Sequence, residues 1–377
     1  VNTFHSSCLR ILKRESRFTR LGEHFSIYDQ SDQLLLIKEC LAEKRLDVKQ
    51  YVPKTIRETI SRAKEALIRP SHMRESASTY YDEVIADVYE LYQKKLNQYK
   101  GIDFGGLIQE CIELFQNEPA ILHRYQERFR YILIDEYQDT NHSQYAWIRL
   151  LAQRYKNLTV VGDPDQSIYG WRGADIENIL RFEHDYPDTH IIKLDKNYRS
   201  TKTILHASNA LIAHNVSRKE KKLWTDQHDG ELLNVYQARD EKDEAEFVIR
   251  NILDLKQNGY TLNEIVVFYR VHAQSRILED NLRRYSIPYR IVGGVRFYDR
   301  KEIKDILAYM RVCLQPDDEI SLKRIINVPS RGIGKRALQQ LDDYKNMYGV
   351  PLWSAITEIE NIRGIQKKKK KSVASFR

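Results

Sequence analysis

An acidic pair, Asp135-Glu136, follows four mostly apolar residues in the stretch YILIDEYQDTN, residues 131–141. In phosphate-transfer enzymes, an Asp at the end of a buried strand holds Mg²⁺, and a neighbouring Glu orients or deprotonates the attacking water. The same pattern also arises where a strand merely ends in an acidic turn, which is common for so short a motif. The pair therefore raises a hypothesis of nucleotide hydrolysis that needs support from other residues.

A second polar cluster occurs in LTVVGDPDQSIYGWRGAD, residues 158–175. Gln166 can hydrogen-bond a terminal phosphate, and Tyr169, Trp171 and Arg172 follow closely. Aromatic rings beside a guanidinium group are typical of sites where the bases of single-stranded nucleic acid stack. Glycines on both sides of Trp171 favour a loop position for this ring over packing in a core strand.

A third segment, HIIKLD at 190–195, runs into Lys196-Asn197-Tyr198-Arg199-Ser200. Arg199 could act as an arginine finger that stabilises charge on a transferring phosphate. Tyr198 could stack on a nucleotide base. By itself, NYRS fits a solvated turn better than a catalytic site.

The elements that carry these clusters alternate between short apolar strands, expected at 131–135, 158–163 and 190–195, and helical patterns. Such alternation predicts a parallel α/β sheet, in which the carboxyl ends of the strands would face one ligand. A second α/β pattern has expected strands at 232–238, 264–270 and 289–293. Residues 30–125 and those after about 297 have helical spacing, and residues 1–6 read as a short strand before a helix over 7–13.

The composition limits the class of protein. A length of 377 residues suits about two to four domains. The net charge is +8, of which the run Lys367–Lys371 supplies five positive charges; this fits a polyanion partner and a solvated surface equally. No apolar run is long enough for a membrane span, so no membrane partner is expected. The four scattered cysteines indicate reduced thiols in a cytoplasmic protein, without a zinc site or a disulfide framework.

Taken together, DEYQD, GDPDQSIYGWRGAD and NYRST resemble the motifs of the UvrD/PcrA/Rep family of superfamily 1 DNA helicases. The resemblance extends over essentially the whole chain, since TFHS at 3–6, VFYRVHAQSR at 267–276, residues 292–311 and INVPSRGIG at 326–334 also match. It implies an α/β fold of RecA-like P-loop NTPase motor domains, with parallel sheets flanked by helices, and inserted helical subdomains. The implied division is 1–28 and 109–199 for the first motor domain, 29–108 for a helical domain inserted in it, 200–296 for part of the second motor domain, and 297–377 for the start of a second inserted helical domain.

The resemblance also implies an activity and residue roles. The activity would be that of an ATP-dependent 3′–5′ DNA helicase and single-stranded DNA translocase, with ATP and Mg²⁺ as cofactors. Its partners would be single-stranded DNA, junctions of single- and double-stranded DNA, and repair or replication proteins. Asp135 would bind Mg²⁺, Glu136 would activate water, Gln166 would sense the γ-phosphate, Arg199 would be the finger, and Tyr198 would stack on adenine. Single-stranded DNA would meet Thr3, Phe4, His5, Tyr169, Trp171, Arg172, Tyr269 and Arg270.

The phosphate loop G-x-x-x-x-G-K-[ST] does not occur among the 15 glycines. RGIGKRA at 331–337 comes closest, but Pro329 and Arg336 stand where that pattern needs Gly and Ser or Thr. The resemblance suggests instead a helix–hairpin–helix-like turn that grips a DNA phosphate, although a plain helix start would look the same. We therefore expect an internal fragment of a helicase that hydrolyses ATP poorly or not at all alone. Two other readings stay open, namely a non-catalytic single-stranded DNA-binding remnant and part of a helicase–nuclease recombination subunit.

Overall fold

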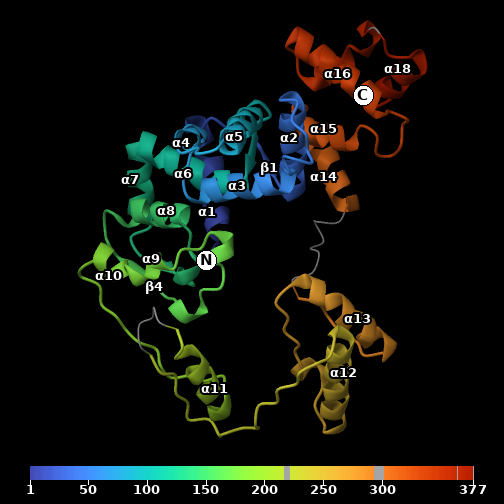
Figure 1. Cartoon of the computed structure of the whole chain (residues 1–377). Helices are drawn as coiled ribbons and strands as arrows, with labels where there is room; N and C mark the ends of the chain where they lie inside the picture. The colour runs from blue at the N-terminus through green and yellow to red at the C-terminus, as the bar shows by residue number, and fades with distance from the viewer. Residues whose placement is uncertain (216–220, 293–300, 363, 377) are drawn as a thin grey trace. The chain divides into compact units, whose positions relative to one another are not determined.

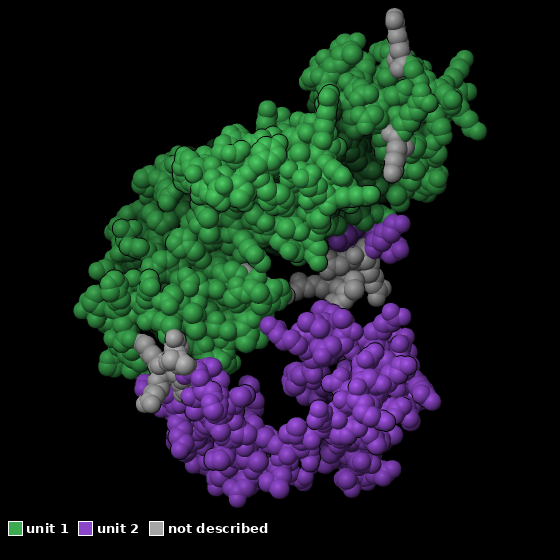
Figure 2. Space-filling model, viewed as in Figure 1, with its two compact units in different colours: residues 1–192, 217–219, 305–377 green, residues 193–216, 220–304 purple. Residues whose placement is uncertain are grey.

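The chain divides into two compact units. The computed structural model describes residues 1–215, 221–292, 301–362 and 364–376, without the side chains of Arg172 and Lys335 (Figure 1). Of these, residues 1–192, 305–362 and 364–376 form unit 1, and residues 193–215, 221–292 and 301–304 form unit 2 (Figure 2).

The first helix of unit 1 starts earlier than the sequence predicted. Helix α1 (Phe4–Arg14) begins directly after Thr3, whose hydroxyl oxygen accepts the backbone N–H of Ser6 at 3.3 Å. The prediction of a strand over 1–6 was therefore wrong, because Thr3 acts as a helix cap and fixes the start of the helix. The buried face of α1, with Cys8, Ile11 and Leu12, packs into the core.

A short parallel strand pair frames the first helical region. β1 (Ser26–Tyr28) pairs with β2 (Gly101–Asp103), and Ser26 lies opposite Gly101. Asp29 and Thr79 form capping boxes that start two of the intervening helices. The sequence predicted the helices but not this strand pair. The intervening helices are α2 (Gln30–Glu43), α3 (Pro53–Glu65), α4 (Pro70–Glu75) and α5 (Tyr80–Gln98).

A buried ion pair joins this helical region to β2. The ammonium group of Lys64 on α3 donates to Oδ2 of Asp103 at 2.7 Å, and the hydroxyl of Tyr92 donates to the same oxygen at 2.8 Å. Burial alone would raise the pKa of Asp103, but the charge of Lys64 and the hydrogen bonds outweigh it and lower that pKa. Burial lowers the pKa of Lys64, and the charge of Asp103 opposes this change.

The second parallel pair confirms the predicted strand–helix–strand order. β3 (Ile132–Ile134) and β4 (Leu158–Val160) pair with Ile132 opposite Leu158, and α8 (His142–Ala152) connects them. Before β3 come α6 (Phe104–Asn117) and α7 (Pro119–Arg128); after β4 come α9 (Glu177–Leu180) and α10 (Phe182–Asp185). The core around these elements includes Leu12, Phe115, Tyr137 and Ile148.

The C-terminal part of the chain is helical, as predicted. The start of α15 contacts β1, because Asp318 accepts hydrogen bonds from Ser26 Oγ at 2.8 Å and Tyr28 Oη at 3.2 Å. The boundary expected at 296/297 lies outside the described residues. The helices are α14 (Lys301–Leu314), α15 (Glu319–Ile325), α16 (Lys335–Tyr348), α17 (Leu352–Thr357) and α18 (Lys367–Ala374).

Unit 2 corrects part of the predicted fold. Its helices are α11 (Lys202–Ile212), α12 (Glu241–Gln257) and α13 (Ser275–Arg284). The described residues of the strands predicted at 190–195, 232–238, 264–270 and 289–293 form no strand, and residue 293 lies outside the described part. A strand satisfies its backbone groups only through a neighbouring strand. Among the described residues, the first of these segments has only one bridging contact, in which the Asp195 carbonyl accepts the backbone N–H of Trp224 at 3.0 Å. Leu194, Val235 and Phe268 are 78%, 97% and 89% exposed.

All four cysteines are unbonded thiols. Cys8, Cys40 and Cys111 are buried, whereas Cys313 on α14 is exposed. Within the described ranges, no helix combines the length and the apolar character that crossing a membrane requires.

Candidate functional site

The acidic pair lies at the carboxyl end of β3, as the sequence predicted. Asp135 and Glu136 are both exposed, and Oδ1 of Asp135 accepts the backbone N–H of Glu136 at 3.0 Å. Glu136 has a left-handed backbone with φ of 52°, which a residue with a side chain rarely adopts. This conformation turns the chain sharply from β3 into the 3₁₀ turn η2 (Tyr137–Asp139) and leaves both carboxylates at the strand end.

Gln138 connects the acidic pair to the neighbouring strand end. Its buried amide donates from Nε2 to Oε2 of Glu136 at 2.7 Å, and its Oε1 accepts the backbone N–H of Asp163 at 3.0 Å. The sequence interpretation missed this residue. Its signal was the Gln inside DEYQD, a polar side chain with no stated role between two acids.

Gly162 permits this connection. A Cβ added at residue 162 would lie 2.6 Å from Oε1 of Gln138 and 2.9 Å from Cδ1 of Ile179. Both distances are shorter than van der Waals contact allows. Glycine is therefore required where the end of β4 approaches the end of β3.

Gln166 belongs to the same hydrogen-bonded series. It ends the 3₁₀ turn η3 (Pro164–Gln166), and its Nε2 donates to Oδ2 of Asp163 at 2.7 Å. The series Glu136–Gln138–Asp163–Gln166 thus runs across the ends of both strands. Unit 1 brings the predicted water-activating acid and the predicted phosphate sensor into one network.

The loop that carries Trp171 is fastened to the same segment. The carbonyl of Thr140 accepts the backbone N–H of Asp175 at 2.9 Å and the side-chain amide of Asn178 at 3.0 Å. Trp171, in the 3₁₀ turn η4 (Gly170–Arg172), is 57% exposed, which agrees with the predicted loop position. Tyr169 directly precedes this turn and is half-buried; the side chain of Arg172 lies outside the described part.

The residues of the TFHS motif lie at the start of α1. Thr3 is exposed and caps the helix, whereas Phe4 and His5 are half-buried. Phe4 packs edge-on against Trp147 with ring centroids 6.0 Å apart, and His5 packs against Phe104 at 5.7 Å. Burial lowers the pKa of His5, which favours the neutral form of its ring.

Tyr198 and Arg199 form a separate group within unit 2. Oδ1 of Asn197 accepts the backbone N–H groups of Arg199 at 2.9 Å and Ser200 at 2.7 Å, which closes a tight turn. Both candidate side chains are exposed. The Lys196 ammonium group lies 5.3 Å from the ring of Tyr198.

Tyr269 and Arg270 lie in unit 2 just before the 3₁₀ turn η6 (His272–Gln274). Tyr269 is half-buried, with its ring 6.0 Å from that of His272. The backbone N–H of Arg270 donates to Oε1 of Gln274 at 3.0 Å. Neither residue lies in a strand, so the strand predicted to carry them is not formed.

The carboxylates fit a Mg²⁺ ion that arrives with a nucleotide. No group of three or more His, Cys, Asp or Glu side chains that could hold an ion occurs in the described ranges. Mg²⁺ needs only one or two carboxylates when phosphates and waters complete its shell, and Asp135 is exposed for that role. Nearby, Oδ1 of Asp139 is a buried acceptor with no hydrogen-bond partner in the described part, and burial and the charge of Glu136 raise the pKa of Asp139.

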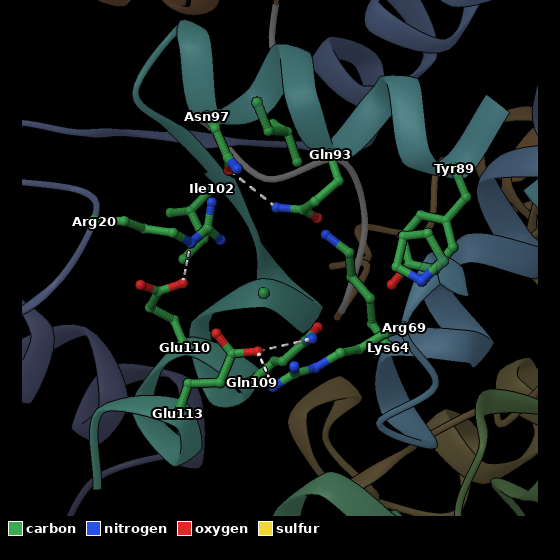
Figure 3. A pocket seen from close by; sticks show the side chains of 13 residues that line it. Arg20, Lys64, Arg69, Tyr89, Gln93, Asn97, Ile102, Gln109, Glu110 and Glu113 are labelled. Atoms are coloured by element: carbon green, nitrogen blue, oxygen red, sulfur yellow. Dashed lines mark hydrogen bonds and ion pairs between the residues drawn. The ribbon is translucent and has the colours of Figure 1, made fainter. Parts of the chain in front are cut away.

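A cavity of about 190 Å³ lies elsewhere in unit 1, beside Lys64 and Gln109 (Figure 3). None of the predicted site residues lines it. Its arginines are already paired, since the Arg20 and Arg69 guanidinium groups lie 2.6 and 3.1 Å from carboxylates of α6. The cavity therefore lacks the unpaired positive charge that a phosphate ligand would need.

Two family models together match almost all of the chain. Residues 1–187 match the UvrD/REP helicase N-terminal domain, and residues 192–364 match the UvrD-like helicase C-terminal domain. The chain belongs to the UvrD/REP helicase family. The motor domains of this family have RecA-like P-loop folds, and the parallel β3–α8–β4 unit is consistent with that architecture.

The curated relatives of this UvrD/REP family member include helicases from several bacteria. The ATP-dependent DNA helicase PcrA of Staphylococcus aureus (strain Mu50) is 45% identical over 376 residues, covering 100% of this chain and 51% of the relative. The ATP-dependent DNA helicase PcrA of Bacillus subtilis (strain 168) is 47% identical over 378 residues, with the same shares. The chain spans about half the length of the curated relatives it matches.

Proposed function

We propose that the chain is part of an ATP-dependent DNA helicase that moves 3′ to 5′ along single-stranded DNA and acts at single-strand/double-strand junctions. The observation that carries this proposal is the series Glu136–Gln138–Asp163–Gln166, which links a candidate catalytic acid to a candidate phosphate sensor. The names of the relatives as ATP-dependent DNA helicases support it.

ATP and Mg²⁺ are the proposed cofactors, which together supply the phosphoryl group and a neutralising charge. Asp135 holds the ion, and Glu136 takes a proton from the attacking water. Gln138 fixes one carboxylate oxygen of Glu136 through its 2.7 Å hydrogen bond, so that the other oxygen is left for the water. Gln166 contacts the terminal phosphate.

Two residues of unit 2 have proposed roles toward the nucleotide. Tyr198 stacks on adenine, and Arg199 stabilises charge on the transferring phosphate. The tight turn at Asn197 orders the backbone of Arg199, which reduces the conformational freedom that the finger loses on binding.

Single-stranded DNA is proposed to stack on the exposed ring of Trp171. His5, whose pKa burial lowers, is a further proposed DNA contact. The other proposed DNA contacts are Thr3, Phe4, Tyr169, Arg172, Tyr269 and Arg270.

We propose the domain division 1–28 with 109–199, 29–108, 200–296 and 297–377 for the two motor domains and their helical insertions. The proposed location is the cytoplasm, and repair or replication proteins are candidate partners there.

The test is ATP hydrolysis by the purified 377-residue chain, with and without single-stranded DNA. We expect hydrolysis at background level, because no G-x-x-x-x-G-K-[ST] loop is present to cradle the phosphates. A Glu136→Gln variant serves as control, since it removes the proposed base and leaves contaminating enzymes unaffected. DNA-stimulated hydrolysis that Glu136→Gln abolishes would show that the chain alone is active.

Binding to a thymidine oligonucleotide tests the single-strand site separately from hydrolysis. Trp171→Ala should weaken single-strand binding by about 1–3 kcal/mol, because one stacked base is lost. Tyr80→Ala, which removes another exposed ring on α5, should leave it unchanged. Binding without turnover would favour a non-catalytic DNA-binding role, and equal affinities of both variants would remove Trp171 from the site.

A further inference from the structure

Glu65, the last residue of helix α3, contacts the loop that carries Trp171. A Cβ added at Gly173 would lie 2.3 Å from Oε2 of Glu65, far inside van der Waals contact, so the carboxylate lies directly against the loop backbone. Gly173 follows the 3₁₀ turn η4 and has a φ of 82°. The left-handed backbone and the close carboxylate therefore both require glycine at this position.

The stability of α3 gives no reason for an acid at residue 65. A carboxylate in the last turn of a helix lies beside the negative end of the helix dipole, which opposes its charge. Glu65 is also half-buried, and this burial raises the pKa of its carboxyl group. The acid is therefore kept at the helix end against two unfavourable effects, and the Trp171 loop is the neighbour that it touches.

The Glu65 carboxylate stands on an anchored part of unit 1. Ser61, one turn earlier on α3, donates from Oγ to Oε1 of Glu65 at 3.1 Å, while Oε2 faces Gly173. The preceding residue, Lys64, is buried and pairs with Asp103 of β2 at 2.7 Å. This pair fastens the end of α3 to the core, so the carboxylate has a fixed support behind it.

Gly173 is well placed to pass this contact on to the indole. Its backbone N–H donates to the carbonyl of Gly170 at 3.0 Å, and this bond closes the turn around Trp171. Further along, the loop is fastened where the N–H of Asp175 donates to the carbonyl of Thr140 at 2.9 Å. A displacement of Gly173 would therefore move the backbone that carries the indole.

We propose that Glu65 is a positioning residue for the binding of single-stranded DNA. Its side chain supports the backbone at Gly173 and thereby keeps the exposed ring of Trp171 oriented for base stacking. The inference rests on the proposed function in taking single-stranded DNA as the ligand of Trp171. A ring that is already held loses less conformational freedom when a base stacks on it, so Glu65 raises affinity without touching DNA.

The test measures binding of the full 377-residue chain to a thymidine oligonucleotide that carries one 2-aminopurine base. Stacking on an indole quenches the fluorescence of this base, so the signal at saturation reports stacking geometry separately from affinity. Glu65→Ala should weaken binding about two- to tenfold, which is the effect of releasing one ordered side chain. It should also reduce the quenching at saturation, which a merely structural role would leave unchanged.

Two matched variants accompany Glu65→Ala. Glu65→Gln should bind and quench like the wild-type chain, because its amide keeps the shape of the side chain and still accepts from Ser61. Glu58→Ala removes another carboxylate of α3, which lies 3.4 Å from the guanidinium group of Arg57, and it should also match the wild-type chain. Circular dichroism checks that each variant is folded.

A double-mutant cycle tests the contact itself. Gly173→Ala introduces both a left-handed alanine and a clash with Glu65, whereas in a Glu65→Ala background only the backbone strain remains. Gly173→Ala should therefore weaken binding more in the wild-type chain than in Glu65→Ala. Equal effects in the two backgrounds would overturn the inference. If Gly173→Ala does not fold, Glu65→Ala and Glu65→Gln decide the question.

The outcomes distinguish this inference from the function on which it rests. Loss of quenching in Trp171→Ala, with Glu65→Ala equal to Glu58→Ala, would overturn the positioning role and leave the single-strand site in place. Unchanged binding and quenching in Trp171→Ala would remove the single-strand site and the inference with it. The positioning role is also overturned if Glu65→Gln loses as much as Glu65→Ala, or if Glu65→Ala quenches fully at saturation.

Discussion

The buried amide of Gln138 holds two strand ends together through one side chain. It bonds Glu136 on one side and the backbone of Asp163 on the other. Its replacement by alanine would take from the part-buried backbone N–H of Asp163 its bond to Oε1 of residue 138 and would release the Glu136 carboxylate. A lost partner of this kind costs about 1–3 kcal/mol.

We expect Gln138→Ala to lower the free energy of unfolding by that amount, measured by urea denaturation of the full chain. The matched control is Gln93→Ala on α5, whose amide makes one exposed hydrogen bond to Asn97 at 3.2 Å. The control should change stability by less than about 0.5 kcal/mol. Equal effects of the two variants would mean that Gln138 does not link the strands.

At the scale of single residues, the sequence predicted that Asp135 and Gln166 lie at neighbouring strand ends. It did not predict the hydrogen bonds of Gln138 that join these ends. Asp135 and Gln166 follow apolar segments, so their position at neighbouring strand ends follows from the geometry of a parallel sheet. The role of Gln138 depends on its side chain folding back between the strands. The requirement for Gly162 depends on that same amide, so neither could be read from a local pattern.

The ion pair of Lys64 and Asp103 joins helix α3 to strand β2 inside the fold. Replacing Lys64 with Met would leave a buried carboxylate without its countercharge, which costs about 3–5 kcal/mol. We expect Lys64→Met to lower the midpoint of urea unfolding accordingly. Arg74→Met, which removes an exposed pairing with Glu90, should cost at most about 1 kcal/mol. A Lys64 effect as small as that of Arg74 would contradict the prediction.

Asp32, in the first turn of α2, gives the stability of unit 1 a pH dependence. Burial, then the charge of Asp29, raises its pKa to about 6, while Arg311, 3.6 Å away, opposes the shift. An acid with a raised pKa binds its proton more tightly in the folded state. Stability from Asp32 is therefore greatest at low pH and is lost as pH rises from about 4 to 6, by up to about 3 kcal/mol.

Asp32→Asn removes this titration and keeps an oxygen for the helix cap. Thermal unfolding measures the stability of the variant and of the wild-type chain at each pH. We expect the stability of the variant relative to wild type to be higher at pH 7 than at pH 4. Asp47→Asn, at an exposed position, is the matched control measured over the same range. A flat difference for Asp32→Asn would contradict a raised pKa.

At the scale of elements, helices were more predictable than strands, although the paired strands β3 and β4 lie where the sequence predicted them. Helical spacing predicted α2, α5 and α14 because one helix creates its own periodicity. Strands β1 and β2 have only three residues each, too few to show alternation. The segment at 232–238 has the composition of a strand, but pairing needs a neighbour that composition does not specify.

At the scale of the whole molecule, we expect the exposed apolar segments of unit 2 to have lower local stability than the core helices of unit 1. Residues 232–238 and 264–268 make no strand pairing with any described residue, whereas α6 and α8 contribute buried side chains to the core. Hydrogen exchange followed by mass spectrometry should show fast exchange in 232–238 and slow exchange in α6 and α8. Slow exchange in 232–238 would mean that this segment pairs with another strand in solution.

Cys313 offers a chemical handle that needs no engineering. It is exposed on α14, while the other three thiols are buried, and burial raises the pKa of Cys40 to about 12 and that of Cys8 well above its ordinary value. Because thiolates react and buried thiols do not, a maleimide dye added to the native chain at neutral pH would attach at this one position. DNA binding to the chain could then be followed by the change in anisotropy or intensity of a single fluorophore on α14.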